Sequence, residues 1–279
     1  MTATKSEDVD SELDVRIDGS GVVHEEVVTL ELEDELALRL DVLNKNINKK
    51  KEDVVAVKVY IERCPELVAM ADSRGMYPIH TAVRRGHEGV VACLLEYGAD
   101  VNTVDDERHF SCLQWACRKG RLAVATMLIE RGADVNYVDA NDGTCAIHWA
   151  AYSGRVDVLE LLLQHGADVV HRDGYGFTPL HWACRRGRKG ATYFLIDRGA
   201  DIEEQTLDGS TPLHCACFEG HQELALGLIE KGADRDHANL VGFSPLELWH
   251  HRGGHWCASV AENGEIATKV LSLHSLATD

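Results

Sequence analysis

The chain lacks any apolar run that approaches the roughly 20 residues of a membrane-spanning helix, and its start, Met1 to Asp10, is polar and acidic. We therefore expect a soluble intracellular protein, in the cytoplasm, the nucleus or both. Cysteine occurs nine times, an odd number, at scattered positions. This usage predicts free thiols in a reducing compartment rather than a disulfide framework.

Catalytic motifs are also missing. The sequence contains no glycine-rich phosphate loop, no nucleophile elbow and no paired-cysteine zinc spacing. It therefore offers no cofactor site and no candidate set of catalytic residues, and we expect a non-enzymatic protein.

Positive charge is scarce. The chain has 28 lysines and arginines against 46 acidic residues, a net charge of -18, which argues against nonspecific attraction to nucleic acid or to anionic membranes. Residues 1–35 alone hold twelve acids against two basic residues, a net charge of -10. We expect residues 1–33 to be an acidic, mostly disordered tail that keeps the protein soluble or contacts a basic surface of the same molecule.

Internal repetition is the strongest feature that is present. The tripeptide Gly-Ala-Asp recurs at intervals of 34, 34, 33 and 33 residues, starting at Gly98, Gly132, Gly166, Gly199 and Gly232. An aliphatic residue stands nineteen positions before each of these glycines, and a second glycine follows seven positions after each aliphatic residue. A period of this length is typical of helical repeat proteins, so each period is expected to be one structural unit.

Each unit carries the start and stop signals of two helices. Thr178-Pro179 and Thr211-Pro212 place a hydroxyl at the N-cap and proline at the first helical position, where its missing N–H group costs nothing. The second glycine, as at Gly187, ends this helix because glycine adopts the left-handed conformation without steric penalty. The next segment, 156–164, is apolar around too much of its circumference for an isolated helix, so neighbouring units must bury it.

These units resemble the ankyrin-repeat family. Thr178-Pro179-Leu180-His181 and Thr211-Pro212-Leu213-His214 are the fullest copies of that family's signature. The resemblance implies an all-α ankyrin-repeat solenoid, in which antiparallel helix pairs with β-turn loops stack so that loops and first helices line a concave groove. Five full repeats are expected at 72–105, 106–139, 140–172, 173–205 and 206–238, between a helical N-terminal cap at 34–71 and a degenerate capping repeat and tail at 239–279.

The second and third repeats depart from the signature. Ser111-Cys112 and Cys145-Ala146 replace threonine-proline, Gln114 replaces the histidine, and His109 stands where other units have glycine. We expect these repeats to lack cap hydrogen bonds and therefore to open more easily than their neighbours.

Two groups of histidines could suggest chemistry. His80, His148, His181 and His214 recur at one repeat position, whereas a catalytic residue is needed once, and the resemblance assigns them a hydrogen-bonding role at the helix start. The cluster His250, His251, His255 and Cys257 has side chains of zinc-ligand type in a spacing that fits no standard site, so we expect no metal but keep a metal-dependent module as an alternative.

The resemblance places the two residues before each second glycine on the groove, and loop positions add further arginines and aromatic residues, a mixture enriched at interaction hot spots. The expected partner-binding residues are Arg74, Met76, Arg84, Arg85, Arg108, Phe110, Arg118, Lys119, Tyr152, Tyr175, Phe177, Arg185, Arg186 and Phe218. Because guanidinium groups bind carboxylates and phosphates in bidentate fashion, we expect the partner to be an acidic or phosphorylated protein segment, held by an adaptor, scaffold or regulatory subunit.

Two other interpretations of these residues stay open. Arginines at helix ends are also favoured simply as solvated partners of the helix dipole. Single-stranded nucleic acid could use the arginines as phosphate contacts and the aromatic rings as stacking platforms.

Overall fold

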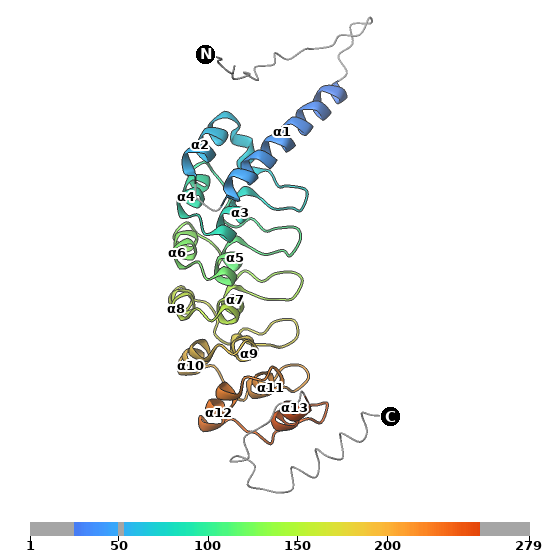
Figure 1. The fold of residues 1–279 in the computed structure, drawn as a ribbon, viewed down its shortest axis with the longest axis vertical. Helices are drawn as coiled ribbons and strands as arrows, with labels where there is room; N and C mark the ends of the chain where they lie inside the picture. The colour runs from blue at the N-terminus through green and yellow to red at the C-terminus, as the bar shows by residue number, and fades with distance from the viewer. Residues whose placement is uncertain (1–24, 50–52, 252–279) are drawn as a thin grey trace, which may run out of the picture.

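The protein is a long stack of helix pairs. A computed structural model describes residues 25–49 and 53–251, with side chains for 36–49 and 53–249 (Figure 1). Within these ranges the chain forms α-helices, one short 3-10 helix and no β-strand, the sole strand-like contact being an isolated bridge between Val104 and Ser111. The expected all-α solenoid is therefore confirmed.

The helices form two columns along the long axis, and the loops project beside the column of first helices (Figure 1). The first helices are α3 (Pro78–Arg85), α5 (Cys112–Lys119), α7 (Ala146–Ser153), α9 (Pro179–Arg185) and α11 (Pro212–Phe218). The second helices are α4 (Glu88–Glu96), α6 (Leu122–Glu130), α8 (Val156–Gln164), α10 (Lys189–Asp197) and α12 (Gln222–Glu230). Helix α13 (Pro245–His251) packs on α11 and continues the first column. No helix in the described ranges has the length and apolar character needed to span a bilayer.

The N-terminal end differs from its predicted division. Helix α1 (Glu25–Ile47) crosses the expected boundary between residues 33 and 34, so residues 25–33 are helical rather than disordered, and residues 1–24 of the expected tail lie outside the described residues. Its later turns add Leu40, Leu43 and Ile47 to the core. Helix α2 (Val54–Arg63) follows, capped by the Asp53 carboxylate, which accepts a hydrogen bond from the Ala56 N–H group at 3.0 Å, and η1 (Pro65–Ala69) leads into the first repeat.

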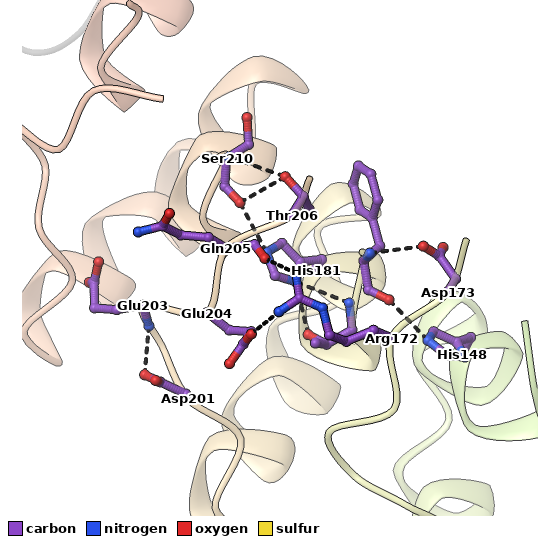
Figure 2. Close-up of polar contacts among 12 residues, drawn as sticks. His148, Arg172, Asp173, His181, Asp201, Glu203, Glu204, Gln205, Thr206 and Ser210 are labelled. Atoms are coloured by element: carbon purple, nitrogen blue, oxygen red, sulfur yellow. Dashed lines mark hydrogen bonds and ion pairs between the residues drawn. The ribbon is translucent and has the colours of Figure 1, made fainter. Parts of the chain in front are cut away.

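Buried polar side chains tie each repeat to the next. The Nε2 atom of each first-helix histidine donates to a carbonyl in the following loop: His80 to Thr103 at 3.1 Å, His148 to Phe177 at 3.1 Å, His181 to Ser210 at 3.2 Å, and His214 to Phe243 at 3.1 Å. Figure 2 shows two of these histidines, His148 and His181, reaching the loop of the next unit. The other ring nitrogen, Nδ1, accepts from the backbone N–H group of the N-cap residue, as from Thr178 to His181 at 3.2 Å. The hydrogen-bonding role expected for these histidines is confirmed.

The second and third repeats keep their caps, contrary to the sequence-based expectation. Ser111 Oγ accepts from the Gln114 N–H group at 3.2 Å, and Gln114 Oε1 accepts from the Ser111 N–H group at 2.9 Å. Gln114 Nε2 also donates to the Thr144 carbonyl at 2.8 Å, so glutamine reproduces both histidine contacts. In the third repeat, the Cys145 N–H group donates to His148 Nδ1 at 3.2 Å. The expected loss of cap bonds was wrong because serine and glutamine satisfy these backbone groups in the second repeat, and the histidine keeps its bond to the N-cap N–H group in the third repeat although cysteine replaces threonine.

Candidate functional site

A ladder of alternating cations and aromatic rings runs along the first helices. The guanidinium group of Arg84 lies 4.7 Å from the centre of the Trp115 ring, and that of Arg118 lies 5.3 Å from the Trp115 ring and 4.8 Å from the Trp149 ring. The rings of Trp149 and Trp182 meet edge to face at 5.1 Å. We call this set, completed by Tyr152 and Arg186, the ladder.

The ladder joins residues from four successive repeats. The ring centres of Tyr152 and Trp182 are 5.8 Å apart, and the guanidinium group of Arg186 lies 4.6 Å from the centre of the Tyr152 ring. Each cation therefore lies near an aromatic ring, either in its own repeat or in a neighbouring repeat, at a distance typical of cation–π interactions. Trp115 and Trp149 are only 5% and 6% exposed, so these two rings contribute little to the outer surface of the ladder.

Two residues of the expected partner-binding set are buried, and that part of the prediction was wrong. Met76 is 1% exposed and Phe110 is 3% exposed. Both occupy the loop position directly before the N-cap, where the chain turns back toward the core, and Phe110 packs against Trp149 with ring centres 4.8 Å apart. Phe110 also contacts Trp115, with ring centres 5.4 Å apart, so its ring lies beneath the ladder.

The other expected residues lie at or near the surface, but several already have intramolecular partners. Arg74 pairs with Asp72 at 3.1 Å, Arg108 with Glu107 at 3.9 Å, and Arg185 with Glu219 at 3.5 Å. Arg85 donates to the Asn48 side chain. Tyr175, 63% exposed, stands on the fourth-repeat loop. Among the described residues, Arg84, Arg118, Lys119 and Arg186 form no ion pair with a carboxylate.

A basic hollow of about 370 Å³ opens where the ladder meets the turns between first and second helices. Its charged lining consists entirely of cations: Arg118, Lys119, Arg121, Arg155 and Arg188. Tyr152, Ser153 and Gly120 complete the lining, so the ladder and the hollow share Arg118 and Tyr152. This arrangement is suited to holding a compact anion.

The cations of the basic hollow repel one another. Burial lowers the pKa of Lys119, and the nearby charges of Arg118, Arg84 and Arg121 lower it further. Burial also lowers the pKa of Arg118, with a contribution from Arg108. Both shifts mean that the charged forms of Lys119 and Arg118 are less favoured here than in water.

Three residues of the basic hollow were missed from the sequence. Arg121, Arg155 and Arg188 follow the inter-helix glycines of three consecutive repeats, whereas the first and fifth repeats have His87 and His221 there. This run of arginine at one repeat position was a signal that could have identified them.

A second hollow, of about 350 Å³, lies between the loops and first helices at the C-terminal end of the stack. Its lining is mostly apolar and includes Phe177, Phe218, Val241 and Phe243, together with Arg185. Three of the expected partner-binding residues, Phe177, Arg185 and Phe218, therefore meet in one place.

The residues that could suggest catalysis or metal binding have structural roles or lie outside the described residues. Burial lowers the pKa of both His148 and His181 to about 4, so both are neutral hydrogen-bonding groups. No group of three or more potential metal ligands occurs in the described part of the chain. His255 and Cys257 lie outside it, and of His250 and His251 only the backbone of α13 is described.

Stacked helix pairs that present a continuous side-chain surface define a helical repeat protein. Profiles described as ankyrin repeats match residues 48–139, 147–196 and 208–240, and together these ranges cover more than half of the chain. The chain belongs to the ankyrin-repeat family, and such repeats are generally protein-protein interaction modules.

One curated relative shares a short repeat segment. A stretch of 55 residues is 44% identical to the serine/threonine-protein kinase VIK of Arabidopsis thaliana and covers 20% of this chain and 13% of the kinase. The chain thus spans a small part of that relative's length. Ankyrin-repeat proteins are typically non-enzymatic.

Proposed function

We propose that this chain is a non-enzymatic interaction module, serving as an adaptor, scaffold or regulatory subunit, which binds an acidic or phosphorylated protein segment along the ladder. One observation carries the proposal. In a chain of net charge -18, Arg84, Arg118 and Arg186 are stacked on aromatic rings without a carboxylate partner among the described residues.

Stacking prepares these arginines for an external anion. A guanidinium group that lies over a ring keeps the N–H groups at its edge available, and these match a carboxylate or phosphate in bidentate fashion. Holding the side chain in place before binding also reduces the entropy lost on association. A negatively charged segment lying across the first helices would meet several such groups in succession.

The geometry favours a protein segment over single-stranded nucleic acid. Nucleobases stack on open aromatic faces. Arg84 and Arg118 cover the rings of Trp115 and Trp149, which are almost completely buried. The ladder therefore offers donors for anions but few free ring faces for bases.

The test measures binding of fluorescent degenerate peptides rich in aspartate and glutamate by anisotropy at low and high salt. We expect the double variant Arg84→Glu, Arg186→Glu to bind at least tenfold more weakly, and the wild-type affinity to fall as salt rises. The control variant Arg63→Glu, Arg131→Glu makes the same change in charge at the ends of α2 and α6, in the other column of helices. An equal loss in the control, or no binding by the wild type, would contradict the proposal.

A further inference from the structure

The position after each inter-helix glycine has a structural role that does not need a charge. His87 Nε2 bonds the Lys49 carbonyl at 3.0 Å, and His221 Nε2 bonds the Arg185 carbonyl at 3.1 Å. Two of the three arginines at this position make the same kind of contact: Arg155 Nη2 donates to the Gly120 carbonyl at 3.2 Å and Arg188 Nε donates to the Tyr152 carbonyl at 3.1 Å. A histidine is sufficient to tie one repeat to the previous one, so the arginine charges of the middle repeats exceed this structural requirement.

The three arginines lie at the N-termini of the second helices, where a positive charge destabilises a helix. Arg121, Arg155 and Arg188 are the N-cap residues of α6, α8 and α10, and none of the three caps its helix with a side-chain hydrogen bond. A cation at a helix N-terminus is repelled by the positive end of the helix dipole, and neither α6 nor α10 has an acidic residue in its first turn to offset it. An anion bound between these arginines would offset the repulsion between their charges and the helix dipoles.

The basic hollow also holds donors that the protein itself does not satisfy. Arg118 Nη1 is buried and has no hydrogen-bond partner among the described residues. Lys119 and Arg121 likewise have no hydrogen bond or ion pair to a described side chain. Arg155 and Arg188 each use one N–H group for a carbonyl and keep the others, apart from a long contact of Arg155 with Asp157 at 3.7 Å.

We propose that the basic hollow binds the phosphoryl group of a phosphoserine or phosphothreonine in the protein segment that lies along the ladder. This inference rests on the proposed function and assigns the chemistry of one subsite. A phosphoryl group has a charge of roughly -1.5 to -2 and three strong acceptor oxygens, whereas a carboxylate has one charge and two oxygens. A hollow whose charged lining is five cations matches the phosphoryl group better, and Arg118 and Tyr152 connect this subsite to the ladder.

The test uses the triple variant Arg121→His, Arg155→His, Arg188→His at pH 8, where histidine is largely neutral. Histidine occupies this position in the first and fifth repeats, so the variant is expected to keep the fold, which circular dichroism checks. Three degenerate peptide libraries rich in acidic residues differ only in a central phosphoserine, glutamate or serine. We expect the wild type to bind the phosphoserine library at least tenfold more tightly than the glutamate library, and the triple variant to bind both equally.

A second arm detects the subsite without peptides. Inorganic phosphate, compared with chloride at equal ionic strength, should raise the melting temperature of the wild type and leave that of the triple variant unchanged. The ladder variant Arg84→Glu, Arg186→Glu should bind all three libraries weakly.

The outcomes separate the two proposals. Ladder-dependent binding with equal affinity for phosphoserine and glutamate, and no stabilisation by phosphate, would overturn the phosphoryl subsite and leave the proposed function standing. Stabilisation by phosphate with no binding of any library would overturn the proposed function and the protein segment as ligand. Binding to vesicles of phosphatidylcholine with phosphatidylinositol 4-phosphate that depends on the three arginines, without preference for phosphoserine, would overturn the inference in favour of a lipid headgroup.

Discussion

Two buried histidines make the stability of the stack depend on pH. Burial lowers the pKa of His148 and His181 to about 4 from an ordinary value near 6.5. The neighbouring His171 and Arg172 lower the respective values further, whereas Asp139 and Asp208 oppose the shift. Figure 2 shows His148 and His181, which extend from α7 and α9 toward the loops of the following repeats, and Arg172 on one of these loops.

The direction of the effect follows from proton binding. Between pH 6.5 and 4 the unfolded chain protonates both histidines while the folded chain does not, so stability is fully present above about pH 6.5 and is lost as the pH falls toward 4. At pH 5 the loss is about 2 kcal/mol for each histidine, or about 4 kcal/mol for the two together.

The chain contains its own control for this prediction. Gln114 makes the same two contacts in the second repeat without titrating, at 2.9 Å and 2.8 Å. The variant His148→Gln, His181→Gln should therefore keep the fold but lose the pH dependence. Urea unfolding at pH 8, 6.5 and 5, followed by circular dichroism, should show the wild type losing about 4 kcal/mol more than the variant. Carboxylates titrate in both proteins and cancel in the difference, so parallel losses would refute the reasoning.

Three further predictions concern packing, backbone and thiols. Phe110→Ala removes a buried ring that packs on Trp149 and should lower the free energy of unfolding by about 3 to 5 kcal/mol in urea titrations, whereas a loss below about 1 kcal/mol would contradict its role under the ladder. His109 has φ of 55°, in the left-handed region that the equivalent glycines of other repeats adopt, so His109→Gly should stabilise the protein by about 0.5 to 1 kcal/mol, and an unchanged or lower melting temperature would contradict this. The eight described cysteines are buried, so a Cys257→Ser variant should show no thiol that reacts rapidly with a disulfide reagent until urea unfolds it, and one fast thiol in the folded state would show that a described cysteine is accessible.

Local signals explain which parts of the fold were predictable. Threonine-proline pairs set the starts of α9 and α11 at Pro179 and Pro212, and glycine ends α3 at Gly86 with φ of 77°. Caps and left-handed glycines depend on a few neighbouring residues, so they can be recognised without knowing what packs nearby. In the second repeat the threonine-proline signal is missing, and the prediction that its cap is lost was wrong because serine and glutamine form a cap there instead.

The candidate site was only partly predictable. The sequence identified Arg84, Arg118 and Arg186 as surface cations of the first helices, but it did not show that Arg118 lies between the rings of two repeats, 5.3 Å from Trp115 and 4.8 Å from Trp149. The sequence also predicted Phe110 as a contact residue, although this ring is buried and packs against Trp115 and Trp149.

What the sequence by itself determined is the scaffold: an even period, two helices in each unit and histidines at one repeated position, all of which follow from short-range capping and apolar spacing. Only the tertiary structure decided which side chains meet. The basic hollow combines residues up to 70 positions apart, from Arg118 to Arg188, and the ladder spans 102 positions, from Arg84 to Arg186, because stacking brings equivalent positions of successive repeats side by side. The distances and the burial that bring these scattered arginines together arise from that stacking alone.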